Sequence, residues 1–149
     1  MAQGLCYRYF SSKEELFDTA LDQYAQRQVD EICSALDSQM SLPEIIKNMP
    51  TFLEAEDDGS YTQKICHGEG NAKFHDQLSL KICSKLQPVV EELLAAARDQ
   101  GNIHVQDVKT MASFCVYGQL GVLLDQKLAA DERVNRIRRF LLELMKSFS

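Results

Sequence analysis

Residues 12–36 have the sequence SKEELFDTALDQYAQRQVDEICSAL, and this stretch decides the fold class. Ser12 and Glu15 form a capping box, in which the hydroxyl accepts a backbone N–H while the carboxylate reaches back to the start of the helix. Apolar residues then recur every three or four positions, as on one face of a helix: Leu16, Phe17, Leu21, Tyr24, Ile32 and Leu36. The pattern predicts a long amphipathic helix that ends near residue 37.

The same helical spacing continues to the C-terminus, and no alternating strand pattern interrupts it. A second capping box, at Ser41 and Glu44, predicts a short helix, and a further short helix is expected over residues 60–67. A long apolar stripe follows residues 68–70, and Pro88 is expected to kink or divide that helix near residues 85–87. The chain is therefore predicted to be an all-α helical bundle.

Local signals also define the next helix. Gly101 and Asn102 predict a left-handed helix stop, and Asp107 is the expected N-cap of the helix that follows. Residues 108–128 are apolar on more than one face, which predicts the most buried helix. Gly118 and Gly121 within it lower helix stability relative to alanine, so we expect them to mark close approach by another helix or by a ligand.

Composition limits the classes of protein to which the chain can belong. Its 149 residues suit one domain, and its formal net charge of -6 argues against a nonspecific polyanion binder. Five cysteines without a CxxC spacing favour a reducing compartment over a disulfide framework. No apolar run is long enough to span a bilayer, and the first residues lack the pattern of a signal peptide. We therefore expect a cytoplasmic protein.

The last helix carries an apolar seam in steps of three and four residues, as in coiled-coil contacts. The residues of this seam are Val134, Ile137, Leu141, Leu144 and Phe148. They predict the interface of a homodimer. The alternative is that the last two helices pack only within one chain, and periodicity does not separate the two possibilities.

Apolar residues with a few polar groups among them suggest a ligand pocket. The candidate lining residues are Phe52, Tyr61, Phe74, Met111, Phe114, Cys115, Tyr117 and Gly118, with plain core packing as the alternative. Cys115 is also a candidate redox sensor, although a lone cysteine on an apolar helix is usually an inert core residue. The sequence shows no order of catalytic residues and no phosphate-binding glycine loop, so neither an enzyme nor a cofactor is expected.

Several side chains of metal-binding type lie in the second half of the chain: Cys66, His67, Glu69, His75, Asp76 and His104. His67 and His75 could converge if the residues between them form a turn. The spacing matches no tight metal template, however, and histidines that cap or join helices are the better explanation. No metal site is predicted.

Residues 3–10 carry side chains suited to DNA binding on a predicted helix of only two turns. Cys6 and Phe10 are four residues apart and can face a core. The remaining side chains spread over the exposed side: Gln3, Gly4, Leu5, Tyr7, Arg8 and Tyr9. Hydroxyls and lysines bind phosphate oxygens, whereas amide and guanidinium groups reach base edges. The alternative is an ordinary amphipathic helix with half-buried tyrosines.

Residues 4–17, GLCYRYFSSKEELF, resemble the recognition helix and the start of the fourth helix of the TetR family of bacterial transcriptional regulators, whose pattern is close to G-x-L-Y-x-Y-F-x-S-K-E-x-L. Cys6 departs from this pattern, because leucine is commonest there. The resemblance implies that bases are approached by Gln3, Gly4, Leu5 and Arg8, and that phosphates are held by Tyr7, Tyr9 and Lys13. The rest of the chain is only loosely similar to the family's C-terminal domain.

The resemblance implies a remnant of a helix-turn-helix DNA-binding domain in residues 1–13 and an effector-binding and dimerisation domain in residues 14–149. The helices that support a recognition helix would precede residue 1, so we expect this polypeptide alone to bind operator DNA weakly or not at all. The implied function is a ligand-responsive transcriptional regulator, a repressor, whose homodimer changes its affinity for operator DNA when an unknown small-molecule effector binds. The alternative is an all-α dimeric small-molecule-binding module without a DNA-binding role.

Overall fold

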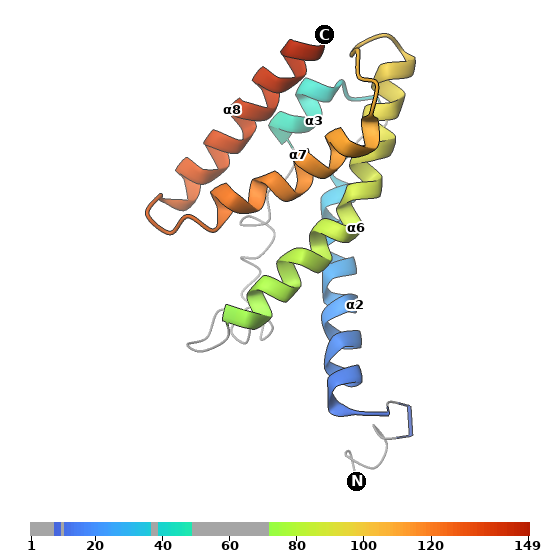
Figure 1. Ribbon diagram of the computed structural model, residues 1–149, viewed down its shortest axis with the longest axis vertical. Helices are drawn as coiled ribbons and strands as arrows, with labels where there is room; N and C mark the ends of the chain where they lie inside the picture. The colour runs from blue at the N-terminus through green and yellow to red at the C-terminus, as the bar shows by residue number, and fades with distance from the viewer. Residues whose placement is uncertain (1–7, 10, 37–38, 49–71) are drawn as a thin grey trace.

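The computed structural model describes residues 8–9, 11–36, 39–48 and 72–149. This part of the chain contains no strand and the following helices: α2 (Lys13–Ser34), α3 (Leu42–Asn48), α6 (Ala72–Asp99), α7 (Val108–Leu123) and α8 (Ala130–Phe148). The predicted all-α class is confirmed for the described residues, whereas the short helix expected over residues 60–67 lies outside them. In Figure 1, α2 packs along α6, while α7, α8 and α3 gather around the C-terminal half of α6.

Ser12 fixes the start of α2, as predicted. Its hydroxyl accepts the backbone N–H of Glu15 at 3.1 Å. The reciprocal half of the capping box is different from the prediction, because the Glu15 carboxylate accepts the backbone N–H of Ser11, at 2.6 Å, and the Ser11 hydroxyl. These hydrogen bonds favour the charged carboxylate and lower the pKa of Glu15. The helix then runs to Ser34, slightly short of the predicted end.

Ser41 and Glu44 meet at the start of α3, where a second capping box is expected. The Glu44 carboxylate accepts the backbone N–H of Ser41 at 2.8 Å and its hydroxyl at 2.6 Å. The carboxylate therefore satisfies a donor that precedes the helix, which is one half of the capping-box pattern. The short helix buries Ile45 and Ile46 on one side.

Pro88 does not divide α6, which is one helix of 28 residues with the proline inside it. Figure 1 shows α6 changing direction along its length. A proline removes one N–H from the hydrogen-bond ladder, and neighbouring packing can hold the helix together around that gap. The helix ends in a Schellman motif at Gly101, whose φ is 77°. The Asn102 N–H donates to the Ala97 carbonyl at 2.8 Å, as that motif requires.

Asp107 caps α7, as predicted. Its carboxylate accepts the backbone N–H of Thr110 at 2.9 Å and the hydroxyl of the same residue at 2.6 Å. These bonds lower the pKa of the Asp107 carboxyl. The helix ends at Leu123 rather than at the expected residue 128, and a short turn leads to α8.

The buried apolar residues form two clusters that share α6, α7 and α8. The first cluster lies where α2 packs on α6, and it consists of Leu21, Tyr24, Ala25, Val29, Ile32, Leu78, Ile82, Cys83, Leu86, Val116, Leu123 and Ile137. The second cluster lies toward α3 and the C-terminus, and it consists of Ile46, Leu94, Ala97, Ile103, Val108, Met111, Ala112, Cys115 and Met145. Burial of these side chains is the main force that holds the helices together.

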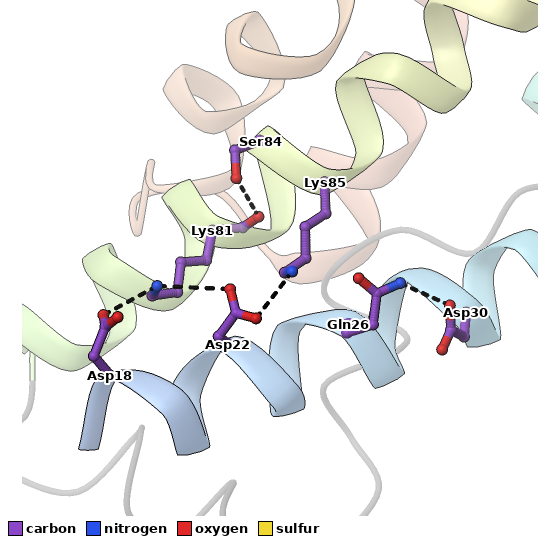
Figure 2. Close-up of polar contacts among 7 residues, drawn as sticks. All are labelled: Asp18, Asp22, Gln26, Asp30, Lys81, Ser84 and Lys85. Atoms are coloured by element: carbon purple, nitrogen blue, oxygen red, sulfur yellow. Dashed lines mark hydrogen bonds and ion pairs between the residues drawn. The ribbon is translucent and has the colours of Figure 1, made fainter. Parts of the chain in front are cut away.

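Ion pairs join α2 to α6 at the edge of the first cluster. As Figure 2 shows, Lys81 lies between two aspartates: its Nζ is 3.0 Å from an Asp18 oxygen and 3.7 Å from an Asp22 oxygen. The Nζ of Lys85 lies 3.1 Å from the other Asp22 oxygen. Both lysines are partly covered, which reduces screening by solvent. The pairs therefore help to set the register of α2 against α6.

Candidate functional site

An apolar groove of about 930 Å³ lies between α7 and α8. Its lining comes from both helices and from the loop before α7: His104, Val105, Gln106, Asp107, Thr110, Met111, Phe114, Cys115, Gly118, Gln119, Val122, Arg136, Ile137, Phe140, Leu141, Leu144 and Phe148. Most of the lining side chains are apolar. The groove therefore offers mainly apolar area, a combination that suits the binding of an apolar surface or molecule.

Hydrogen bonds fix the walls of the groove. The His104 backbone N–H donates to the Phe148 carbonyl at 2.6 Å, which ties the loop before α7 to the end of α8. The Gln119 side-chain amide donates to the Cys115 carbonyl, four residues earlier in α7, at 2.8 Å. Arg136 pairs with Glu132 on α8, with 2.7 Å between Nε and Oε1. These polar groups are therefore engaged with the groove's own walls.

Large apolar side chains on this face are exposed to solvent. Phe114 on α7 is 77% exposed and Phe140 on α8 is 61% exposed, and both line the groove. Tyr117 on α7, Leu124 at the C-cap of α7 and Phe148 on α8 are also exposed. Single exposed apolar residues are common, whereas a continuous apolar groove with two exposed phenylalanines is typical of surfaces that bind another molecule.

Gly118 and Gly121 lie on the same face of α7 as Phe114, at helical steps of four and three residues. No heavy atom of the described residues lies within 4 Å of a Cβ built at either glycine. Within the described residues, therefore, no other helix approaches these glycines, and the expected approach by a ligand or by a helix of another chain stays a prediction. They leave space on the exposed side of α7.

Only some of the predicted ligand-pocket residues line the groove. Met111, Phe114, Cys115 and Gly118 line the groove, whereas Tyr117 is exposed beside it and is not among the lining residues. Phe74 lies elsewhere, with its ring centroid 4.5 Å from that of Phe17 on α2. Phe52 and Tyr61 lie outside the described residues.

The predicted dimer residues also differ from one another in their burial and in whether they line the groove. Val134 and Ile137 are buried within one chain, so their side chains pack inward. Leu141, Leu144 and Phe148 line the groove together with Ile137. The predicted ligand set and the predicted dimer set therefore meet at one open groove. Sequence reasoning missed Phe140, which stands outside the seam of the last helix but is its most exposed large apolar residue.

Burial changes the chemistry of the described cysteines. Desolvation raises the pKa of the Cys115 thiol, and it raises that of Cys83 to about 11. Burial and the neighbouring Asp30 carboxylate raise the pKa of Cys33 as well. Because the thiolate is the reactive form, these shifts favour the inert core role of Cys115 over a redox sensor.

The described part of the chain holds no group of three or more His, Cys, Asp and Glu side chains arranged to bind a metal ion. The His75 Nδ1 lies 3.9 Å from an Asp76 oxygen, and His104 is exposed in the loop before α7. Cys66, His67 and Glu69 lie outside the described residues. Among the helices that the structure describes, none is both long and apolar enough to cross a membrane.

Three of the predicted DNA-binding residues can be placed. Arg8, Tyr9 and Lys13 are exposed, and Lys13 is the first residue of α2. Gln3, Gly4, Leu5 and Tyr7 lie outside the described residues. The exposed positions leave these side chains accessible to a phosphate backbone.

The buried amide of Gln28 is a further feature that sequence reasoning missed. It is 1% exposed, and within the described part of the chain neither its Nε2 nor its Oε1 has a hydrogen-bond partner. The sequence signal that could have identified it is a polar residue on the buried face of α2, between Tyr24 and Ile32.

Comparison of the chain with protein-family models, with curated proteins and with solved structures gave no match.

Proposed function

We propose that this chain is the sensing and dimerising part of a ligand-responsive transcriptional regulator of TetR type, acting as a repressor. The observation that carries the proposal is that the motif resembling a DNA-recognition helix is joined directly to a helix of the buried core. Residues 4–17 resemble a recognition helix and lead directly into α2, whose start is capped by Ser12. The apolar face of α2 belongs to the first cluster. A change in the packing of this core would therefore act on the helix that follows the motif.

Homodimerisation through the α7–α8 face is part of the proposal. The groove, with Phe114 and Phe140 exposed, provides apolar surface that a second copy can cover. Symmetric pairing brings the same patch of both subunits together, and two helices from each subunit form a four-helix contact. The exposed residues of α8 include Arg139 and Glu143, so both signs of charge are present and self-pairing is not opposed by charge of one sign.

The proposal is tested by isolating the DNA fragments that the protein binds in its native host. The protein is expressed from its own gene and recovered with an antibody raised against the purified chain. We expect enrichment of a short site with two-fold symmetry, as for other dimeric helix-turn-helix proteins. Arg8→Ala should lower the enrichment about tenfold, because loss of an arginine contact to a base or phosphate weakens binding by that order.

Lys47→Ala is the matched control, because Lys47 is an exposed cation on α3, far along the chain from the motif. Its enrichment should equal that of the wild type. If no site is enriched, or if Arg8→Ala enriches the same sites equally well, the regulator is excluded. The dimeric small-molecule-binding module, which the net charge of -6 favours, then takes its place.

A further inference from the structure

Gln28 occupies a position where an apolar side chain is expected. It lies on the buried face of α2, one turn after Tyr24 and one turn before Ile32. Its side chain is 1% exposed, and both amide atoms lack a hydrogen-bond partner within the described part of the chain. The amide is therefore cut off from water without a replacement from the protein.

An amide in this position is unfavourable for folding. Buried polar groups in proteins are nearly always paired, and a donor or acceptor left without a partner loses the hydrogen bonds that water gave it. Methionine has a similar length and flexibility and would fill the same space without that loss. Within the described residues, Gln28 thus carries an unmet hydrogen-bonding demand.

We propose that Gln28 is the polar contact of an effector site in the layer between α2 and α6, and that its ligand is a neutral, largely apolar molecule with an amide or lactam group. The side-chain amide presents a donor beside an acceptor, and an amide or lactam presents the complementary pair. The inference deepens the proposed function and rests on its ligand response.

The buried side chains of the described residues indicate the charge of the ligand. The buried polar side chains among the described residues are Gln28 and Ser79, and neither is charged. Cys83, on the buried face of α6, has its pKa raised to about 11 by burial, so its thiol is neutral at physiological pH. A charged ligand would lose its hydration here without gaining a buried counter-ion, which strongly disfavours it. A neutral molecule avoids that penalty.

The test measures thermal unfolding of the purified chain with benzamide, hexanamide and caprolactam. Benzoate, hexanoate and toluene serve as charged and apolar counterparts. We expect at least one amide to raise the Tm of the wild type, and its counterparts to leave the Tm unchanged. Gln28→Met should remove that response, and without ligand it should melt about 3 °C higher than the wild type, a shift that corresponds to a modest gain in stability for a domain of this size.

Gln23→Met is the matched control, because Gln23 is an exposed glutamine on the same helix. It should keep both the Tm and the amide response of the wild type. A second measurement does not rely on thermal unfolding. The side-chain NH₂ signal of Gln28 in a ¹⁵N–¹H spectrum is identified by its loss in Gln28→Met. This signal should shift when the active amide is added.

Three results would overturn the inference: no amide raises the Tm, the amide response survives in Gln28→Met, or unliganded Gln28→Met melts at or below the wild type. Its failure is distinguishable from that of the proposed function. Operator enrichment without any amide response removes the Gln28 site alone. An amide response that depends on Gln28, without operator enrichment, leaves the site in place and removes the regulator.

Discussion

The layer between α2 and α6 and the face formed by α7 and α8 both consist of apolar helix stripes, but only the first is covered. Where α2 packs on α6, residues such as Ile32, Leu78 and Ile82 are buried, and ion pairs from Lys81 and Lys85 line the edge. Between α7 and α8 there is an open groove, and Phe114 and Phe140 remain mostly exposed. The contrast separates apolar surface that the chain covers itself from apolar surface that the described residues leave exposed.

The difference also shows in the polar groups of the two regions. At the α2–α6 edge, charged side chains reach across from one helix to the other. On the α7–α8 face, the ion pair of Arg136 stays within α8. Cross-helix ion pairs fix α2 to α6, whereas α8 is joined to α7 and to the loop before it by hydrogen bonds to backbone carbonyls, from Arg133 to Leu123 and from the His104 N–H to Phe148.

The largest expected effect comes from opening the covered layer. Ile82 is 1% exposed in the first cluster, so Ile82→Ala should lower the free energy of unfolding by about 3 kcal/mol, through lost apolar burial and the cavity left behind. Urea denaturation at a fixed protein concentration measures this change. Leu80→Ala, on an exposed position of the same helix, is the control and should change stability little. Equal losses for both variants would contradict the assignment of Ile82 to the core.

A smaller effect is expected from placing a charge on the open face. Phe140→Asp should leave the fold of the single chain intact, because the side chain is 61% exposed. It should weaken homodimerisation at least about thirtyfold, which corresponds to about 2 kcal/mol, because an unpaired carboxylate would be desolvated at the interface. Sedimentation equilibrium measures the dissociation constant. A wild-type chain that stays monomeric, or a variant that dimerises as well as the wild type, would remove the dimer from the proposal.

The smallest effect on stability is expected at the glycines of α7. No heavy atom of the described residues lies near a Cβ added at Gly121, so in a chain made monomeric by Phe140→Asp, Gly121→Ala should raise the free energy of unfolding by about 0.7 kcal/mol. In the dimer the gain should shrink or reverse if the second copy approaches this glycine. Equal gains in both backgrounds would exclude close approach there.

Gly101→Ala is a control for that experiment, in which stability should fall and not rise. Gly101 has a φ of 77°, a backbone conformation that alanine adopts with strain. The substitution should lower stability by about 1 kcal/mol in both backgrounds. Urea denaturation of the four variants therefore distinguishes helix propensity from contact with a second copy.

Local signals predicted much of the fold because they act within a few residues. The Ser12 and Asp107 caps and the left-handed Gly101 depend on the hydrogen bonds of one helix turn, and all three are found. For Pro88 the sequence left both a kink and a break open, and the structure has one helix that changes direction along its length (Figure 1). Packing on both sides of the proline holds α6 as one helix, and tertiary packing cannot be judged from the local sequence.

The site was harder to predict because periodicity identifies an apolar face without showing what covers it. The seam of the last helix includes Val134 and Ile137, which are buried, whereas the exposed Phe140 lies outside the seam. Gly118 and Gly121 indicated a close neighbour, but that neighbour is absent from the described chain. Gln28 was a visible irregularity of the apolar stripe, and its significance emerges only when the environment of its amide is known.

The position of Pro88 has a consequence for how the two halves of the molecule move. With 28 residues, α6 is about 42 Å long and takes part in both apolar clusters. Leu86 belongs to the first cluster and Leu94 to the second, so Pro88 lies between them, and the backbone hydrogen bond that it cannot make is the one to the Ser84 carbonyl, one turn earlier. Bending α6 there meets less elastic resistance than bending it elsewhere. Because α7 and α8 also take part in both clusters, a bend at Pro88 would change their contacts as well as the angle between the clusters.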